Sequence, residues 1–408
     1  MPSLPPLDPE ALRPLFPALA RAHGGRPAVF ADGPGGTQVP RAVIDAMVTY
    51  LERSNANTHG AFPTSHETDA VIEGVHRAAA DLLGCGADEV VFGQNATSLL
   101  FAVSRAIGRT LGPGDEVVVT RLDHDANVRP WVRMAEDAGA TIRWVDLRED
   151  DVTLDLASFD AALSERTKVV AFTLASNAVG STTPAADLAR RAHDAGAVVA
   201  MDAVHATPHR PIDVAALGAD LLACSAYKFF GPHVGVLFAR RDLLAAWPAY
   251  KVRPATETLP HRWETGTQNH EGYAGTTAAI DYLASLGEGA DRRARLVAAM
   301  TRIADHESRL SSRFLEGVAG RTDVRLFGIA DPARVTERTP TFAVRVADEA
   351  PAATARRLAD AGIYAWDGNY YALELMERIG LQEGGGAVRI GFAHYTTDDE
   401  VDRVLEAL

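Results

Sequence analysis

The chain has 408 residues, of which 47% are hydrophobic and 23% are charged. This composition is typical of a globular protein, and the length predicts two or three domains around a large core. The net charge of −14 argues against binding to nucleic acid or to anionic membranes, because both partners carry a negative field of their own.

Short β-rich apolar runs alternate with amphipathic helical stretches through the first two thirds of the chain. We expect strands at 90–92, 116–120, 142–145, 168–173, 198–201, 221–224 and 234–238, and helices at 97–107, 130–138 and 185–195. Apolar strands separated by helices predict an α/β fold, in which a mostly parallel seven-stranded sheet lies between helices.

The pattern changes after about residue 275 and predicts a smaller α+β domain. We expect helices at 273–286, 291–317, 352–361 and 398–408, the last one capped by Thr397, and strands at 324–327, 341–346 and 387–392. We therefore assign residues 26–274 to a large domain and residues 1–25 and 275–408 to a small one. The first 25 residues are expected to pack with the small domain or at the domain interface.

The cysteine content and the N-terminal residues bear on the cellular location of the protein. The two cysteines, Cys85 and Cys224, argue against a disulfide framework and lack metal-ligand spacing, and we expect no metal site. A reducing cytoplasm is the simplest location. The first residues lack the cationic and apolar runs of a signal peptide, and no apolar stretch reaches the ~18 residues that a membrane helix needs.

Two residues at strand ends are candidates for catalysis. Lys228 follows an apolar strand and precedes the aromatic pair Phe229-Phe230, and an amine in such an apolar place can be a nucleophile with a lowered pKa. The alternative for Lys228 is a surface lysine that caps a loop. Asp202 ends another apolar strand 26 positions earlier, where α/β sheets bind ligands, although it could also only cap the next turn.

Further polar residues follow strand ends in the same way. Asn95-Ala96-Thr97 lies between a strand and the start of a helix, where free N–H groups and a hydroxyl can bind phosphate. Ser225 can add a second hydroxyl. His124 and His205 each follow a strand end, and each is interpreted either as an acid–base group or as a structural histidine.

In the order and spacing of these segments, the sequence resembles the class V aminotransferase family, and within it the cysteine desulfurase-like subgroup. The resemblance extends from Phe30 to Thr397. It rests on Asn95-Ala96-Thr97, Asp123-His124-Asp125-Ala126-Asn127, Ser176-Asn177-Ala178-Val179-Gly180, Asp202-Ala203-Val204-His205, Ser225-Ala226-Tyr227-Lys228, Glu264-Thr265-Gly266-Thr267 and Arg389-Ile390-Gly391. The resemblance implies the fold type I of pyridoxal 5′-phosphate (PLP) enzymes, with the large domain binding PLP.

The resemblance also implies roles for single residues. Lys228 would form a Schiff base with PLP and move the α-proton of a small amino-acid substrate, Asp202 would pair with the pyridine nitrogen, and His124 would stack on the ring. Other expected cofactor contacts are Asn95, Ala96, Thr97, Asn177, His205, Ser225 and Tyr227, and expected substrate contacts are Asn177, Arg389, Tyr371, Trp366 and His59. Thr267 and His270 would reach the phosphate of the other subunit, which implies a homodimer with active sites at the subunit interface.

The sequence departs from the family where cysteine desulfurases carry their sulfur-accepting cysteine. Tyr371 falls on that position, and Trp366 falls where a second carboxylate-binding arginine usually stands. We therefore expect a PLP-dependent lyase that eliminates a β-substituent, most plausibly a sulfur-bearing one, without forming a persulfide. The alternatives are an aminotransferase or epimerase, a desulfurase that passes sulfur to an external thiol or partner protein, and a PLP-binding protein that is not an enzyme.

Overall fold

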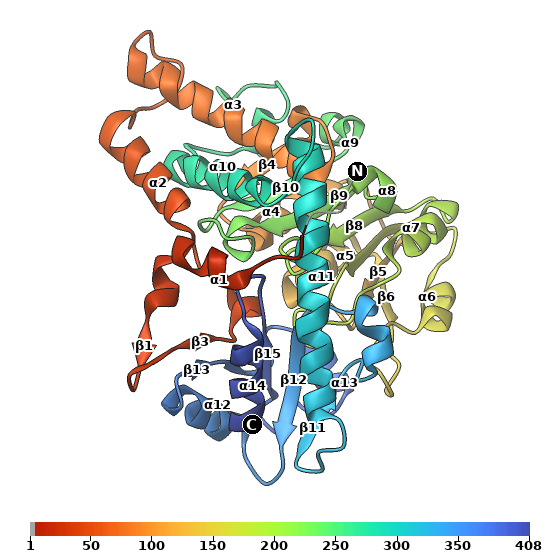
Figure 1. Cartoon of the computed structure of the whole chain (residues 1–408). Coiled ribbons are helices and arrows are strands. Elements are labelled where there is room, and N and C mark those ends of the chain that lie inside the picture. The colour runs from red at the N-terminus through yellow and green to blue at the C-terminus, as the bar shows by residue number, and fades with distance from the viewer. Residues whose placement is uncertain (1–4) are drawn as a thin grey trace.

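The computed structural model describes residues 5–408, which form two regions with a sheet each, and the long helix α11 (Arg292–Val318) runs along both (Figure 1). The larger sheet has seven strands in the order β4 (Val90–Gly93), β10 (Gly235–Ala239), β9 (Leu221–Ser225), β8 (Val198–Asp202), β7 (Thr167–Thr173), β5 (Glu116–Thr120) and β6 (Thr141–Val145). All neighbours pair in parallel except β10, which is antiparallel to β4 and β9. The predicted fold class is confirmed.

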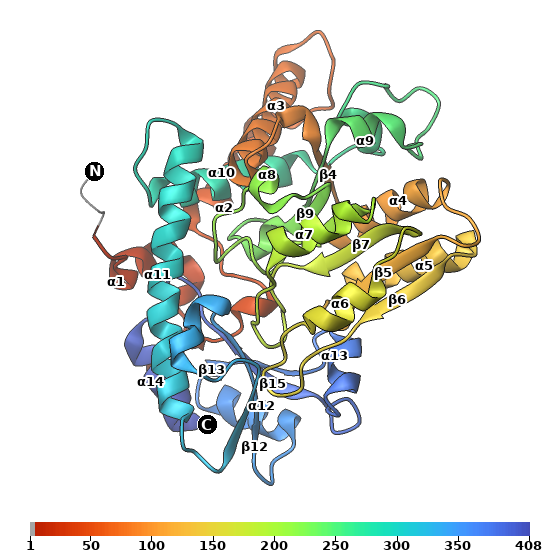
Figure 2. The ribbon, with the colours of Figure 1, turned by 90° about the vertical axis from the view of Figure 1, so that its right-hand side faces the viewer.

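Helices cover both faces of this sheet because its strands are apolar on both sides (Figure 2). In β5, Val117 and Val119 belong to one core and Val118 to the other, as the alternation of side chains along a strand requires. The first core includes α4 (Ala96–Gly108) and α5 (Arg129–Ala138), and the second includes α3 (Pro63–Leu83), α6 (Leu156–Ala162), α7 (Ala185–Asp194) and α10 (His270–Ser285).

The second region is built on a four-stranded antiparallel sheet. Its strand order is β11 (Val324–Phe327), β12 (Thr341–Val346), β15 (Ala387–Gly391) and β14 (Trp366–Gly368). It packs with α11, α12 (Pro351–Asp360) and α14 (Asp398–Ala407), and α13 (Leu373–Arg378) follows β14. Thr397 caps α14 by accepting a hydrogen bond from the Glu400 N–H at 3.2 Å, so the predicted cap is confirmed.

The N-terminal segment joins the two regions. Phe16 is buried and packs its ring against Phe230, Tyr282 and Tyr395, which belong to different parts of the chain. Further on, β3 (Val29–Phe30) pairs in parallel with β13 (Ile363–Tyr364). Because α10 runs across residues 274 and 275, the domain limits stay a prediction.

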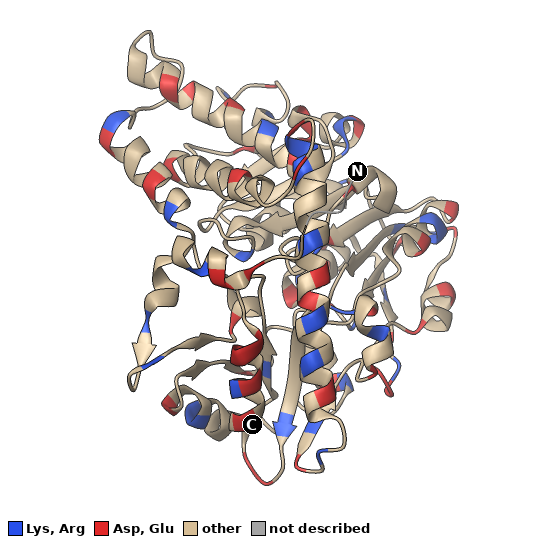
Figure 3. Ribbon diagram, in the orientation of Figure 1, with Lys and Arg blue, Asp and Glu red and all other residues tan. Residues whose placement is uncertain are grey.

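Several elements have no counterpart in the sequence prediction. The longest are α2 (Arg41–Arg53), α3 and α6, and the short ones are α1 (Pro9–Leu12), α8 (Val214–Leu217), α9 (Arg241–Ala246), α13, β1 (Ala22–His23), β2 (Arg26–Pro27) and β14. Charges of both signs are interspersed over the ribbon, including along α11 (Figure 3). Within residues 5–408, no helix combines the length and the apolar composition needed to cross a membrane.

Candidate active site

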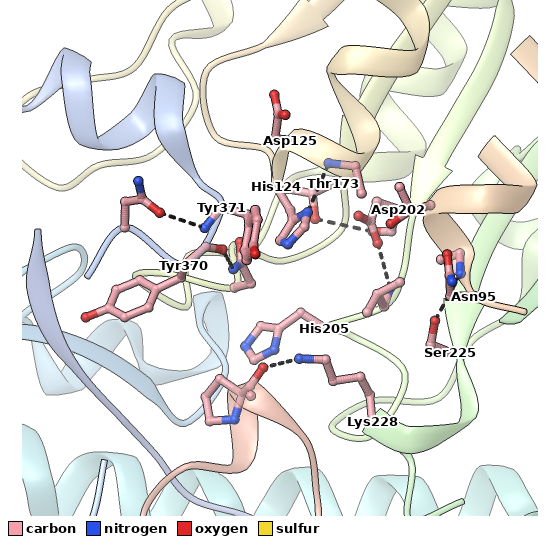
Figure 4. Close-up of a pocket in the computed structure, with 18 of the residues that line it drawn as sticks. Asn95, His124, Asp125, Thr173, Asp202, His205, Ser225, Lys228, Tyr370 and Tyr371 are labelled. Carbon is pink, nitrogen blue, oxygen red and sulfur yellow. Dashed lines mark hydrogen bonds between the residues drawn. The ribbon is translucent and has the colours of Figure 1, made fainter. Parts of the chain in front are cut away.

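A cavity of about 970 Å³ lies at the carboxyl ends of β7, β8 and β9 and is bordered on its other side by β14 and β15 (Figure 4). This is the edge at which α/β sheets bind ligands. Most of the predicted site residues line it: Asn95, Ala96, Thr97, His124, Asn177, Asp202, His205, Ser225, Tyr227, Lys228, Trp366, Tyr371 and Arg389.

Lys228 is buried at the end of the short helix η6 (Ala226–Lys228), which follows β9 directly. Its Nζ donates a hydrogen bond to the carbonyl oxygen of Pro34. Burial, and next the charge of Arg389, lower the pKa of Lys228 to about 7, because both disfavour the ammonium form. A large part of this amine is therefore neutral and nucleophilic near pH 7.

Asp202 is the last residue of β8, the strand beside β9, and it is buried. Its Oδ1 accepts a hydrogen bond from the Val204 N–H at 2.7 Å. Burial raises the pKa of Asp202 to about 6, although this hydrogen bond and the charge of Lys228 oppose the rise. A cation placed beside this carboxylate would favour its ionised form.

His124 follows β5 and faces the same cavity. Its Nδ1 accepts a hydrogen bond from the Ala126 N–H at 3.0 Å, so the neutral ring carries its proton on Nε2. Burial, aided by the charges of Lys228 and Arg389, lowers the pKa of His124 to about 4. The ring of Tyr371 stacks on His124 with 5.6 Å between the ring centroids.

Arg389 and Asn177 form a polar wall opposite the sheet. The Nη1 of Arg389 donates to the Asn177 carbonyl oxygen at 3.0 Å, and the Asn177 side chain donates to the Tyr370 carbonyl oxygen at 2.9 Å. Within residues 5–408, the buried Arg389 Nε and Asn177 Oδ1 have no hydrogen-bond partner. A guanidinium held in this way can bind a carboxylate through two parallel hydrogen bonds.

The N-terminus of α4 supplies a place for an anion. Asn95 caps this helix by accepting from the Ser98 N–H at 2.9 Å, and the Ala96 N–H donates to the Ser225 hydroxyl at 3.4 Å. Thr97 lines the cavity at the same place. Free N–H groups and the positive end of the helix dipole favour a phosphate here.

Comparison with known proteins decides the family. The sequence matches the family described as Aminotransferase class-V over residues 29–404. The chain belongs to the class V aminotransferase family. Members of this family are PLP-dependent enzymes, so the prediction of an enzyme of this class is confirmed.

Similar proteins support the cysteine desulfurase-like subgroup. A "Probable cysteine desulfurase" from Streptomyces coelicolor is 34% identical over 98% of this chain and 96% of its own. "Probable cysteine desulfurase 2" from Mycobacterium leprae is 35% identical over 99% of this chain and 96% of its own. The apo cysteine desulfurase of Thermococcus onnurineus NA1 has a TM-score of 0.87 at 26% identity, and the match covers 100% of this chain and 98% of that one.

His205 lines the cavity and also contacts two threonine hydroxyls of the second region. Its Nε2 lies 2.9 Å from the Thr341 hydroxyl and 3.2 Å from the Thr339 hydroxyl, both of which lie beyond the cavity in the second region. Burial lowers the pKa of His205 well below its usual range, so the ring is neutral. His205 therefore connects the cavity wall with β12.

Three predicted residues do not line the cavity of their own chain. His59 is exposed, and its Nδ1 lies 3.3 Å from the Asp69 carboxylate. Thr267 lies in the segment that leads into α10, and His270 is the first residue of α10 and is buried near Tyr50. A role for Thr267 and His270 at the phosphate of another subunit stays a prediction.

Sequence reasoning gave no role to Asp32 and its neighbours. The Asp32 Oδ1 is buried without a partner among the described residues, and burial raises the pKa of this carboxyl to about 6. Pro34 and Gly35 line the cavity, and a Cβ at Gly35 would lie 2.7 Å from the Trp366 Nε1. The glycine-rich run after Asp32 is the signal that could have indicated such a close approach.

The lowered pKa of Lys228 predicts how its reactivity depends on pH. In the cofactor-free chain, we expect the rate of acylation of Lys228 by a small anhydride to rise about tenfold per pH unit and to level near pH 7. Mass spectrometry of peptides would follow Lys228, with the exposed Lys168 as the comparison. A rate at Lys228 that keeps rising through pH 9 would contradict the assignment.

Proposed function

We propose that the chain holds PLP covalently on Lys228 and cleaves the bond between the β-carbon of a small amino acid and a sulfur-bearing substituent. The observation that carries this proposal is the meeting of three groups in one cavity: a buried amine with a lowered pKa, a buried carboxylate on the next strand, and a buried guanidinium opposite both. This set provides sites for a cofactor aldehyde, a ring nitrogen and a substrate carboxylate.

The residues present fit this cofactor. Asp202 would pair with the ring nitrogen, and the N-terminus of α4 together with Ser225 would hold the phosphate. The unpartnered Arg389 Nε and Asn177 Oδ1 support a further polar ligand in the cavity, because buried polar groups normally have hydrogen-bond partners. Tyr227, which lines the cavity and stacks on His233, would contact the phosphate side.

The chain's own groups would orient the substrate and move its protons. When bound, PLP supplies an electron-withdrawing ring that stabilises negative charge at the α-carbon of the substrate. Arg389 and Asn177 would hold the substrate carboxylate, and the Lys228 Nζ would accept the α-proton. His124, whose neutral ring carries its proton on Nε2, would donate a proton to the departing sulfur.

The chain's two cysteines support a reaction that needs no enzyme thiol. Cys224 is fully buried in β9, and burial raises its pKa to about 12. Burial likewise raises the pKa of Cys85 to about 12, and Cys85 does not line the cavity. A sulfur acceptor must be accessible and ionised, and neither cysteine meets that requirement.

The names of the relatives favour a second candidate, a desulfurase that passes sulfur to an external thiol. That reaction would use the same cofactor residues and would differ in the fate of the sulfur. An aminotransferase or an epimerase would use them too, but no contact in the cavity favours either. The products distinguish all of these reactions.

We also propose that the protein is a homodimer in which Thr267 and His270 complete the phosphate site of the neighbouring subunit. Exposed apolar side chains, such as Val48 and Leu51 on α2 and Val252 in the segment before α10, support contact with a second copy. A monomer in sedimentation experiments on the holoenzyme would contradict this proposal.

Product analysis tests the proposed reaction. Incubation with L-cysteine is expected to give pyruvate, ammonium and sulfide, because elimination followed by hydrolysis uses one water and needs no reductant. A desulfurase would give alanine and a persulfide on the added thiol, an aminotransferase would give the sulfur-bearing keto acid, and an epimerase would give D-cysteine. Any of these three outcomes, or no turnover of cysteine and its thioethers, would refute the lyase.

A cysteine-free variant tests the independence from enzyme thiols. We expect Cys85→Ser/Cys224→Ala to keep turnover within about threefold of the original, since neither thiol faces the cavity and loss of one small buried group is a modest change. The initial rate of product release, normalised to bound cofactor, is the measurement. A loss of more than about 100-fold with normal cofactor content would indicate a thiol acceptor.

A further inference from the structure

A cluster of metal-binding side chains lies outside the cavity, where α3 meets the segment that leads into α10. His76 on α3, His261 in the short helix η7 (His261–Trp263) and Glu264 just after it have their ligand atoms within 4.8 Å of one another. Within residues 5–408, this is the one group of three such residues. The side chains of His76 and Glu264 are 5% and 4% exposed, whereas His261 is 44% exposed.

Both ring nitrogens of His76 face hydrogen-bond acceptors. Its Nδ1 lies 2.7 Å from the Ile72 carbonyl oxygen, and its Nε2 lies 2.9 Å from the Glu264 Oε1. Both neighbours are acceptors, but a neutral imidazole has only one N–H. If Nδ1–H donates to the carbonyl, the Nε2 lone pair faces the carboxylate, and either a second proton on His76 or a metal ion between the two groups removes this repulsion.

Glu264 contacts both His76 and His261. The His261 Nδ1 lies 3.0 Å from the Glu264 Oε2, so the two imidazoles approach opposite oxygens of one carboxylate. The Phe92 N–H also donates to the Glu264 Oε1 at 2.9 Å, which holds the carboxylate in place. Zinc distances of about 2.0–2.2 Å place tetrahedral ligand atoms about 3.3–3.6 Å apart, so ligand atoms that lie up to 4.8 Å apart would approach each other by up to roughly 1.3 Å on binding.

We propose that His76, His261 and Glu264 bind a divalent transition metal ion of the zinc class, with a water molecule as the fourth ligand on the exposed side of His261. Two imidazoles and one carboxylate are a common zinc ligand set. The hydrogen bond from His76 to the Ile72 carbonyl fixes the tautomer that a metal ligand requires. No local sequence pattern indicates this site, because His76 and Glu264 are 188 positions apart.

The proposed ion would fix the start of the segment that carries Thr267 and that ends at His270, the first residue of α10. It links this segment to the long helix α3, which packs against α10 in the second core. An effect on the neighbouring subunit would rest on the proposed dimer. The metal site itself does not depend on the reaction or on the oligomeric state.

The experiment uses the tag-free holoenzyme after removal of metals with a chelator. Equilibrium dialysis against zinc, with elemental analysis, is expected to give one ion per chain. Binding should weaken at least about 100-fold in His261→Ala and in Glu264→Gln, because a direct ligand matters more than an outer hydrogen-bonding partner, whose loss costs roughly 10–100-fold. His66→Ala, an exposed histidine on the same helix, is the matched control and should bind normally.

Cobalt absorption gives an independent readout. Tetrahedral Co²⁺ absorbs in the visible range beyond the cofactor band, and this absorption should disappear in His261→Ala. Equal binding by His261→Ala and the original chain, or no stoichiometric ion in the original chain, would overturn the proposal and leave a protonated His76 paired with Glu264. Because His261 is half exposed, its variant decides the question even if Glu264→Gln does not fold.

Discussion

Replacement of Lys228 by alanine is expected to abolish covalent retention of PLP and to lower turnover by about 10⁴-fold or more, since one amine both holds the cofactor and moves the α-proton. The chain has three lysines, Lys168, Lys228 and Lys251, and only Lys228 lines the cavity. Its burial and lowered pKa make it the amine that can react at neutral pH.

Borohydride reduction followed by peptide mapping measures this directly. In the original chain, the cofactor mass should appear only on the peptide that contains Lys228. Lys168→Ala is the matched control, because its side chain is partly exposed and lies 4.0 Å from the Asp115 carboxylate. Cofactor mass on another lysine, or cofactor retained covalently by Lys228→Ala, would end the assignment.

Replacement of Asp202 by asparagine is expected to leave PLP attached to Lys228 while turnover falls by about 10²–10³-fold. The amide has nearly the shape of the carboxylate, but it has no charge with which to hold a proton on the ring nitrogen. The change should therefore appear in kcat more than in KM. Retained turnover in this variant would show that the charge of Asp202 is not used.

Asp123 offers a matched control for this experiment. It is buried near Asp202, and burial raises its pKa to about 8, so it is largely protonated at neutral pH. The Asn127 side chain donates to its Oδ1 at 2.7 Å, and the Thr120 hydroxyl contacts its other oxygen. An asparagine at position 123 can accept from Asn127 through its Oδ1 and donate its amide N–H to the Thr120 hydroxyl oxygen, so Asp123→Asn should change turnover by less than about threefold.

The parts of the fold that the sequence predicted are those with a strong local pattern. The strands at 116–120, 324–327 and 341–346 have the predicted limits because apolar β-formers end abruptly at polar or turn residues. In contrast, α3 was missed although it is long. Its first turns bury the polar side chains of Ser65 and Thr68 and so give no apolar signal, although the apolar stripe from Val71 to Leu83 does have helical spacing.

The same distinction applies to the candidate site. Lys228 and Asp202 were predicted because Asp202 ends one apolar strand and Lys228 follows the next, and parallel strands place their carboxyl ends at one edge of a sheet. Asp32 and Pro34 received no role, because Pro34 meets Lys228 across 194 positions and the strand before this turn, β3, has only two residues and gives no local pattern. Tyr371 was predicted as a substrate contact, but its stacking on His124 was not predicted.

The sequence by itself determined the sheet, its ligand-binding edge and the residues at that edge, because side-chain periodicity and strand ends are local properties of the chain. Only the tertiary structure decided the protonation preferences, since the lowered pKa of Lys228 and the raised pKa of Asp202 result from burial by segments distant in sequence. The tertiary structure also places His76 next to Glu264. Burial and long-range contact depend on how the whole chain packs, and no local pattern encodes them.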